Sequence, residues 1–189
     1  MGKLVYSIMC SLDGYVADPD GNFDWAEPDE EVHTYVNDRQ RQIGLHLYGR
    51  RMYEVLAVWE ADDWMVDEPA YIHDYATVWR SADKIVYSRT LEEANTSRTR
   101  IERRFDPGTV PALKAGVDRD VMIGGPELAA QALRGGVVDE IELFVAPVVV
   151  GAGHAALPPG LRLPLELIEE RRFSNGMVAL RYRTLPASA

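Results

Sequence analysis

Val121-Met-Ile-Gly-Gly-Pro-Glu-Leu128 is the stretch that decides the fold. Three apolar residues lead into Gly124-Gly125, and Pro126 stands where a helix would begin. Glycine allows a sharp turn and carries no Cβ that would hold a ligand off, and proline suits the first position of a helix. The free N–H groups of such a first turn, with the helix dipole, favour an anion. The stretch therefore predicts strand, glycine turn and helix, with either a phosphate or no ligand at the turn.

The composition predicts one acidic globular domain. The chain has 189 residues, of which 47% are hydrophobic and 26% charged, and its formal net charge is -10. We predict a single domain over residues 1–189. The charge excludes nucleic-acid binding as a main function, since phosphate backbones need a basic surface. One cysteine, Cys10, and four scattered histidines predict no metal site. Because a signal-peptide pattern and an apolar run of membrane length are both missing, we expect a cytoplasmic protein with no membrane partner.

Around the glycine turn, the hydrophobic pattern alternates between strands and helices. The expected strands are Lys3–Cys10, Leu45–Tyr48, Lys84–Ser88, Thr99–Phe105, Val117–Ile123 and a long one from Val137 to Val150. The expected helices are Asp29–Ile43, a second one from Arg50 through Trp59, Pro69–Trp79, Pro107–Ala115 and Glu127–Arg134. Ser174-Asn-Gly176 joins two further strands, Leu165–Phe173 and Met177–Thr184, and Asn-Gly is a strong hairpin signal. The order predicts an α/β fold: a mixed, mostly parallel sheet with helices on both faces and an antiparallel C-terminal hairpin.

Arginines follow two of the expected strands. Gly49-Arg50-Arg51 opens the second helix, where two cations have the wrong sign for a helix N-terminus unless an anion meets them. Ser88-Arg89 follows the next strand, and ligands bind open α/β sheets beyond the carboxyl ends of strands. The alternative is that Arg50 and Arg51 simply point into solvent.

Gly151-Ala-Gly-His-Ala-Ala156 matches the dinucleotide fingerprint G-x-G-x-x-G/A in letters only. The fingerprint needs a helix directly after it, to direct the helix N-terminus at a pyrophosphate. Pro158-Pro159 forbids that helix, so we reject a Rossmann assignment. Gly151 and Gly153 remain candidates for a close approach of backbone or ligand to a strand end.

Taken together, five motifs occur in one order: Ser11-Leu-Asp-Gly14, Gly49-Arg-Arg51, Ser88-Arg89, Gly124-Gly-Pro-Glu127 and Pro147-Val-Val-Val-Gly-Ala-Gly153. This set resembles the dihydrofolate-reductase-like superfamily. It is most similar to the branch with the C-terminal reductase domain of bifunctional riboflavin-biosynthesis enzymes and its stand-alone relatives. The resemblance covers nearly the whole chain.

The resemblance implies NADPH as cofactor. The family's residues at Gly49, Arg50 and Arg51 meet the cofactor phosphates, and those at Ser88 and Arg89 lie by the adenosine 2′-phosphate. The family's turn at Gly124, Gly125, Pro126 and Glu127 holds the pyrophosphate, with Gly151 as a further candidate contact. The stretch from Asp13 to Trp25 matches a loop over the nicotinamide and the substrate. The family also often pairs through sheet elements, so we expect a homodimer.

The chemistry implied is hydride transfer from NADPH to a small planar heterocycle of the pterin or riboflavin-pathway aminopyrimidine type. Such a reaction needs positioning and sometimes one acid. Asp13, just after the first strand, is the candidate acid; alternatively it only forms its own turn. Trp25 is the candidate stacking residue; alternatively it belongs to the core. A second functional hypothesis is a nucleotide-binding regulatory protein that keeps the NADPH pocket without turnover.

Overall fold

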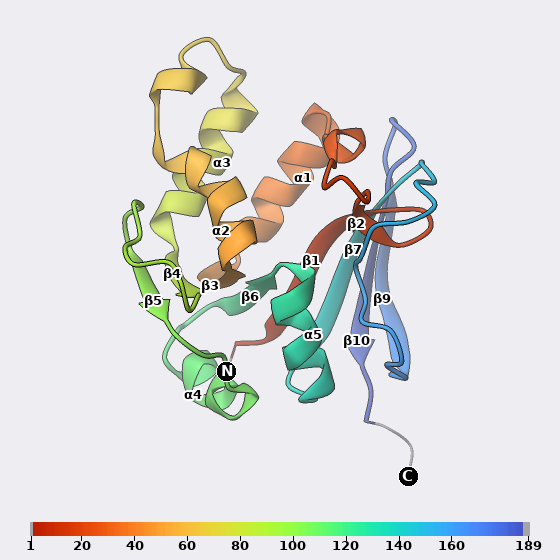
Figure 1. Cartoon of the computed structure of the whole chain (residues 1–189). Helices are drawn as coiled ribbons and strands as arrows, with labels where there is room; N and C mark the ends of the chain where they lie inside the picture. Colours follow the sequence, from red (N-terminus) through yellow and green to blue (C-terminus); the bar gives the residue numbers. More distant parts are fainter. Residues whose placement is uncertain (1, 187–189) are drawn as a thin grey trace.

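The computed structural model describes residues 2–186, which form an eight-stranded sheet, a two-stranded ribbon and the helices around them (Figure 1). The strand order in the large sheet is β5-β4-β3-β6-β1-β7-β10-β9. Only β10 runs against its neighbours. The predicted α/β class, with a mostly parallel sheet and an antiparallel C-terminal hairpin, is confirmed. The strands are β1 (Leu4–Ser11), β3 (Ile43–Gly49), β4 (Asp83–Tyr87), β5 (Thr99–Glu102), β6 (Asp120–Gly124), β7 (Glu140–Ala146), β9 (Leu165–Arg172) and β10 (Val178–Thr184).

Helices cover both faces of the sheet. One face carries α4 (Val110–Ala115) and α5 (Pro126–Arg134), and we call it the α5 face. The opposite face, the α1 face, carries α1 (Glu30–Gln40), α2 (Arg50–Leu56) and α3 (Ala70–Ser81). Short 3-10 turns complete the connections: η1 (Asp24–Ala26), η2 (Ala57–Glu60), η3 (Asp63–Met65) and η4 (Pro107–Thr109). In the part of the chain that the structure describes, none of the helices combines the length and apolarity needed to cross a membrane.

The cores follow from the alternation of side chains along the strands. Leu4 and Tyr6 of β1 point to the α5 face, where Leu128, Ala129 and the other inward residues of α5 meet them. On the α1 face, Phe144 of β7 packs with Val32 of α1 and Phe173 of the hairpin. The parallel strands are therefore buried from both sides, as their almost continuous apolar sequence predicts.

Several expected boundaries are wrong. The strand expected at Thr99–Phe105 ends at Glu102, and the strand expected from Val117 begins at Asp120. The helix expected to run to Ile43 ends at Gln40, and Ile43 begins β3. The second helix, expected through Trp59, ends at Leu56, and the 3-10 turn η2 follows it. The late strand ends at Ala146, where Pro147 follows, and not at Val150.

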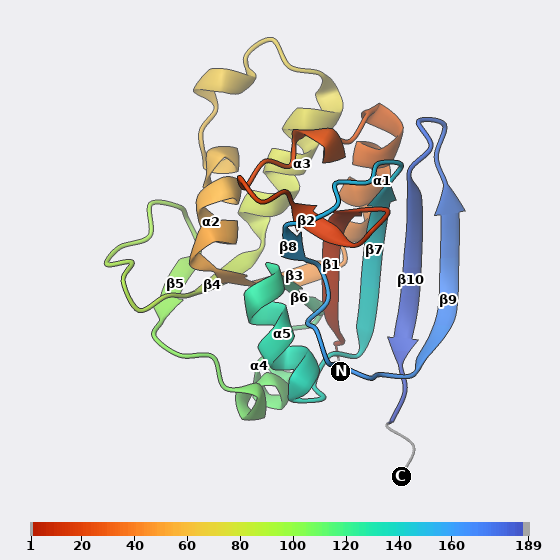
Figure 2. The ribbon, with the colours of Figure 1, turned by 45° about the vertical axis from the view of Figure 1, so that its right-hand side comes forward.

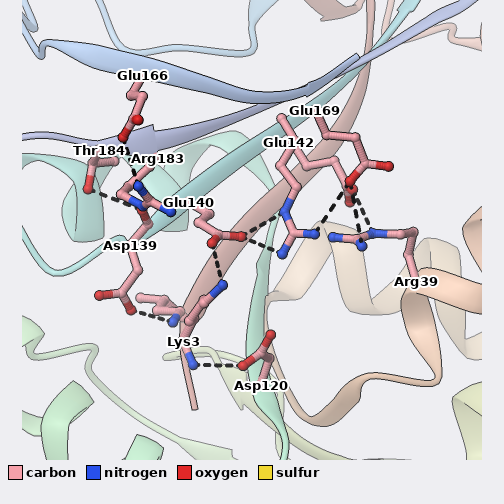
Figure 3. A network of polar contacts seen from close by, with 12 residues as sticks. Lys3, Arg39, Asp120, Asp139, Glu140, Glu142, Glu166, Glu169, Arg183 and Thr184 are labelled. Atoms are coloured by element: carbon pink, nitrogen blue, oxygen red, sulfur yellow. Dashed lines mark hydrogen bonds and ion pairs between the residues drawn. The ribbon is translucent and has the colours of Figure 1, made fainter. Parts of the chain in front are cut away.

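Strand β7 carries Glu140 and Glu142 on its α1 face, and both are buried. Glu140 pairs with Lys3 (2.6 Å) and with Arg181 of β10, and Glu142 accepts hydrogen bonds from Arg39 of α1 (2.9 Å) and from Ser7 (2.9 Å). Figure 3 shows this network at the amino ends of the central strands. Burial raises the pKa of Glu142, and Arg39 opposes that shift. The network thus allows two carboxylates in a strand that would otherwise be apolar.

β7 is also an interior strand, since it pairs with β1 on one side and with β10 on the other. The late strand therefore presents no unpaired edge to a second copy of the chain. The edges are β5 and β9. Figure 2 shows β9 and β10 at the right-hand end of the sheet, with no helix in front of them. Leu165 and Leu167 of β9 are exposed there.

Candidate functional site

The three predicted anion-binding segments meet at one edge of the sheet. Gly49 is the register partner of Tyr87, which directly precedes Ser88. Tyr48 is the register partner of Gly124. The carboxyl ends of β4, β3 and β6 are therefore neighbours, and we call this region the β3–β6 half of the edge. The carboxyl ends of β1 and β7, with β2 (Tyr15–Ala17) and β8 (His154–Ala155) beyond them, form the β1–β7 half.

The glycine turn has the predicted form. Pro126 is the first residue of α5, and Gly125 before it has a φ of 89°. The first backbone bond of the helix runs from the Ala129 N–H to the Gly125 carbonyl (3.0 Å), so the N–H groups of Glu127 and Leu128 have no acceptor within the helix. A Cβ at Gly124 would lie 3.0 Å from the Tyr48 ring. Both glycines are thus needed for the chain to pass this point, and the turn leaves amides free at its end.

Arg50 and Arg51 begin α2, directly after Gly49. A Cβ at Gly49 would meet only the Leu128 side chain, at 3.9 Å, so the backbone there is open to close approach. Arg50 lies 3.8 Å from Glu54, and Arg51 lies 3.7 Å from Glu127 of α5. Both arginines are exposed, and surface pairs of this length contribute little. Their guanidinium groups therefore remain available to an anion at this edge.

Ser88 is buried, and its hydroxyl accepts hydrogen bonds from the N–H groups of Thr90 (3.3 Å) and Leu91 (3.0 Å). It therefore shapes the loop that presents the exposed Arg89. The sequence analysis missed Arg103, which follows β5 and donates to the carbonyls of Ser88 (3.1 Å) and Leu91 (2.6 Å). The strand expected at Thr99–Phe105 was the feature of the sequence that could have identified Arg103. When that strand pairs in parallel with β4, Arg103 lies next to Ser88.

Asp13 connects the two loops of the β1–β7 half. Its carboxylate accepts hydrogen bonds from the Ser11 hydroxyl (2.6 Å) and from the N–H groups of Val150 (3.2 Å) and Gly151 (2.7 Å). The bond from Ser11, followed by those from the two amides, lowers the pKa of Asp13. These contacts favour the turn-forming alternative over a proton donor, because a carboxylate held by three donors keeps its charge.

Gly151 has a φ of 81° and Gly153 a φ of 139°. A Cβ at Gly153 would lie 2.0 Å from the Ala17 carbonyl oxygen, so only glycine allows this loop to reach β2. β8 then pairs with β2, and no helix follows the fingerprint-like glycines. The rejection of the Rossmann assignment is therefore confirmed.

Trp25 lies in η1 and packs against the cluster of Val32, Phe144 and Phe173. Its indole N–H is buried without a hydrogen-bond partner among the described residues. The core alternative accounts for most of its surface. Three exposed apolar side chains lie nearer the surface of this half: Leu12 is 67% exposed, Phe23 48% and Val149 66%. Leu12 and Val149 are close together, because the Leu12 N–H donates to the neighbouring Val148 carbonyl (2.8 Å).

Two hollows lie away from this edge. One of about 380 Å³ lies at the amino ends of β1, β3 and β6, and its charged walls are the ion pairs of Figure 3. Another of about 680 Å³ lies between α1 and the β9–β10 hairpin, and is lined by Asp29, Glu30, Glu31 and Arg171, among others. Among the described residues, no group of three or more histidines, cysteines or carboxylates has the geometry of a metal site.

Fold and edge together define an α/β protein with glycine turns, free amides and arginines at the carboxyl ends of neighbouring parallel strands. Residues 2–179 match the family model described as the RibD C-terminal domain, and the chain belongs to that family. The predicted resemblance is thereby confirmed. A similar protein is YyaP of Bacillus subtilis (strain 168), which is 27% identical over 184 residues, 95% of this chain and 94% of YyaP.

Solved structures share the fold at low identity. A putative riboflavin biosynthesis protein from Shewanella sp. PV-4 aligns with a TM-score of 0.76 at 18% identity, over 97% of this chain and 99% of the other. A pyrimidine reductase-like protein from Corynebacterium diphtheriae gives 0.71 at 15% identity, over 98% and 93%. A diaminohydroxyphosphoribosylaminopyrimidine deaminase/5-amino-6-(5-phosphoribosylamino)uracil reductase from Thermotoga maritima gives 0.64 at 14% identity, and this chain covers 57% of it.

Proposed function

We propose that the protein is an NADPH-dependent reductase that transfers a hydride to a small planar heterocycle. The observation that carries the proposal is the β3–β6 half. In a chain of net charge -10, Arg50, Arg51 and Arg89 gather at adjacent strand ends beside a glycine turn with free amides. Arginine binds phosphate through a rigid fork of donors, and amides at a helix start favour a pyrophosphate. The family supports the same reading, since a relative of this fold carries a reductase name.

The residues present fit the cofactor. The open backbone at Gly49 and the turn at Gly124-Gly125 would admit the pyrophosphate, and the loop from Ser88 to Leu91 would present Arg89 to the 2′-phosphate. NADPH would supply the hydride, and solvent would supply the proton that completes reduction of the acceptor. Asp13 would act as a positioning residue, because it fixes the loop at Gly151 against the end of β1. Leu12 and Val149 would give the acceptor an apolar surface.

A regulatory protein that binds NADPH without turnover is the second candidate. The hydrogen-bonded, low-pKa state of Asp13 favours it, since this carboxylate does not serve as an acid near neutral pH. The two candidates are separated by measuring NADPH affinity and NADPH oxidation with a panel of pterins and aminopyrimidines. Oxidation with any member at a rate above the protein-free control supports the reductase. Tight NADPH binding with no oxidation by the whole panel supports the regulatory protein.

A further inference from the structure

The cations of this chain are unevenly distributed around the carboxyl edge. The β3–β6 half has Arg50, Arg51, Arg89 and Arg103. The β1–β7 half is built from two segments that contain no lysine or arginine, Leu4–Asp38 and Glu140–Leu161. The first of these segments contains nine acidic residues, and the second contains Glu140 and Glu142. One half of the edge is therefore cationic, and the other is apolar and acidic.

The cations from other parts of the chain that contact these segments are already engaged. Lys3 and Arg181 pair with Glu140, and Arg39 pairs with Glu142, at the amino ends of the strands. Arg41 pairs with Asp38, and Arg134 donates to the Pro159 carbonyl.

The donors of Arg80, in the α3 helix that packs against α1, are also occupied. Arg80 of α3 donates to the Trp59 (2.7 Å) and Ala61 (3.2 Å) carbonyls and pairs with Asp62 at 2.7 Å. These partners, in η2 and directly after it, occupy the donors of the Arg80 guanidinium group. It offers no free counter-ion to a ligand at the end of β1.

Arg171, near the end of β9, is engaged as well. It lies 3.4 Å from Glu31 of α1, and its guanidinium carbon sits 4.9 Å from the centre of the Tyr35 ring. β9 is separated from β1 by β10 and β7, three strand spacings or about 14 Å. Arg171 is therefore bound to α1 and lies well to the side of the β1–β7 half.

We infer that the hydride acceptor of this protein carries no phosphate group, and is an uncharged or cationic flat heterocycle held at the β1–β7 half. The inference rests on the proposed function, because it assigns the other half of the edge to NADPH. A phosphate dianion that leaves water needs compensating donors, either arginine or lysine side chains or free amides at a helix start such as those after Gly125. In the β1–β7 half it would meet the Asp13 carboxylate and the apolar surface of Leu12, Phe23 and Val149. The aminouracil named for the Thermotoga maritima relative carries a 5-phosphoribosyl group, so this chain would differ from that protein in its acceptor.

The test compares acceptors that differ only in the phosphate. Suitable pairs are 5-amino-6-(5-phosphoribosylamino)uracil with its dephosphorylated form, and FMN with riboflavin. Oxidation of NADPH is followed at pH 8, where ordinary histidine is neutral and cannot supply the missing charge. We expect kcat/KM to be at least about tenfold higher for an uncharged member than for its phosphorylated partner, because like charges repel in this half.

A variant that adds a positive charge next to the proposed acceptor site tests the same preference in a second way. Leu12→Arg places a cation directly after β1, and Val66→Arg makes the same change at another exposed apolar residue, in the connection between η3 and α3. Leu12→Arg should shift the ratio of kcat/KM values toward the phosphorylated member by at least about threefold, whereas Val66→Arg should leave it unchanged.

The outcomes separate this inference from the proposed function. Preference for the phosphorylated members, an unchanged ratio in Leu12→Arg, or reduction of phosphorylated acceptors alone would each overturn the inference. Failure of NADPH to bind, or NADPH binding with no reduction of any acceptor, phosphorylated or not, would instead overturn the proposed function.

Discussion

Asp13 Oδ2 accepts a hydrogen bond of 2.7 Å from the backbone N–H of Gly151, 138 residues further along the chain. This contact fixes the loop after β7 against the loop after β1. It also occupies the carboxylate that would otherwise be the first candidate for a proton donor in the β1–β7 half. The pKa of Asp13 is lowered, first by the hydrogen bond from Ser11. The carboxylate therefore remains ionised from neutral pH down to below its ordinary range.

The first prediction concerns the role of Asp13. Asp13→Ala should raise KM for the acceptor and leave the NADPH dissociation constant within about twofold, since the loop at Gly151 loses its anchor but the β3–β6 half does not. The profile of kcat/KM between pH 5 and 8 should keep its shape in both Asp13→Asn and Asp13→Ala. If the unaltered protein shows an ionisation in this pH range and Asp13→Asn lacks it, the proton-donor hypothesis would be restored.

The second prediction concerns the glycine turn. Gly125→Ala places a side chain at a φ of 89° and only 3.3 Å from Met52 Cβ. Gly136→Ala is the matched control, because its φ of 65° is also left-handed but nothing lies within 4 Å of the new Cβ. Both variants should lose about 1–2 kcal/mol of unfolding free energy. Only Gly125→Ala should weaken NADPH binding, which calorimetric titration would measure; equal weakening in both variants would contradict the assignment.

The sequence predicted the parts of this fold that depend on local chemistry. Gly124-Gly125-Pro126 forms the turn it predicts, and Ser174-Asn-Gly176 joins β9 and β10, with Gly176 at a φ of 90°. The features it missed depend on partners distant in the chain. Glu140 and Glu142 are buried because Lys3, Arg181 and Arg39 reach them.

The candidate site likewise has features that the sequence predicts and features that depend on residues distant in the chain. Gly49 and Gly124 could be placed at one edge, because parallel strands end together. To predict the contact of Arg103 with the Ser88 loop, one must know that β4 pairs with β5, and the sequence alone does not show which strands are neighbours. Asp13 was identified from its place after β1, but its three donors are the Ser11 hydroxyl and the amides of Val150 and Gly151, in a loop that begins where a strand was expected to continue to Val150.

The third prediction concerns stability at alkaline pH. Lys84 is buried, and burial lowers its pKa from 10.5 to about 8. The folded state therefore loses this proton at lower pH than the unfolded chain, so the unfolding free energy rises as the pH passes from about 8 toward 10.5. Relative to Lys84→Met, the unaltered protein should gain about 2 kcal/mol between pH 7 and pH 10, measured by urea unfolding. A difference that stays constant over this range would show that Lys84 titrates normally.

The fourth prediction is that the protein associates as a homodimer through β9 and β10. Leu165 and Leu167 are exposed on edge strand β9, beside Tyr182 of β10. Exposed apolar edges of this kind are normally covered. Light scattering at micromolar concentration should give a dimer, and Leu167→Glu should give a monomer. Val66→Glu, at an equally apolar exposed position outside the sheet, should leave the dimer intact. A stable monomer of the unaltered protein would contradict the prediction.

The central claim is that the arginines of the β3–β6 half bind the phosphates of NADPH, and the most direct measurement is the ratio of NADH to NADPH dissociation constants. A charge-assisted hydrogen bond contributes about 1.5–3 kcal/mol, so NADPH, which has one phosphate more, should bind at least about tenfold more tightly. Arg50→Ala and Arg89→Ala should each reduce that ratio by weakening NADPH, whereas Arg134→Ala, at the far end of α5, should not. Equal affinity of the unaltered protein for NADPH and NADH would contradict the account.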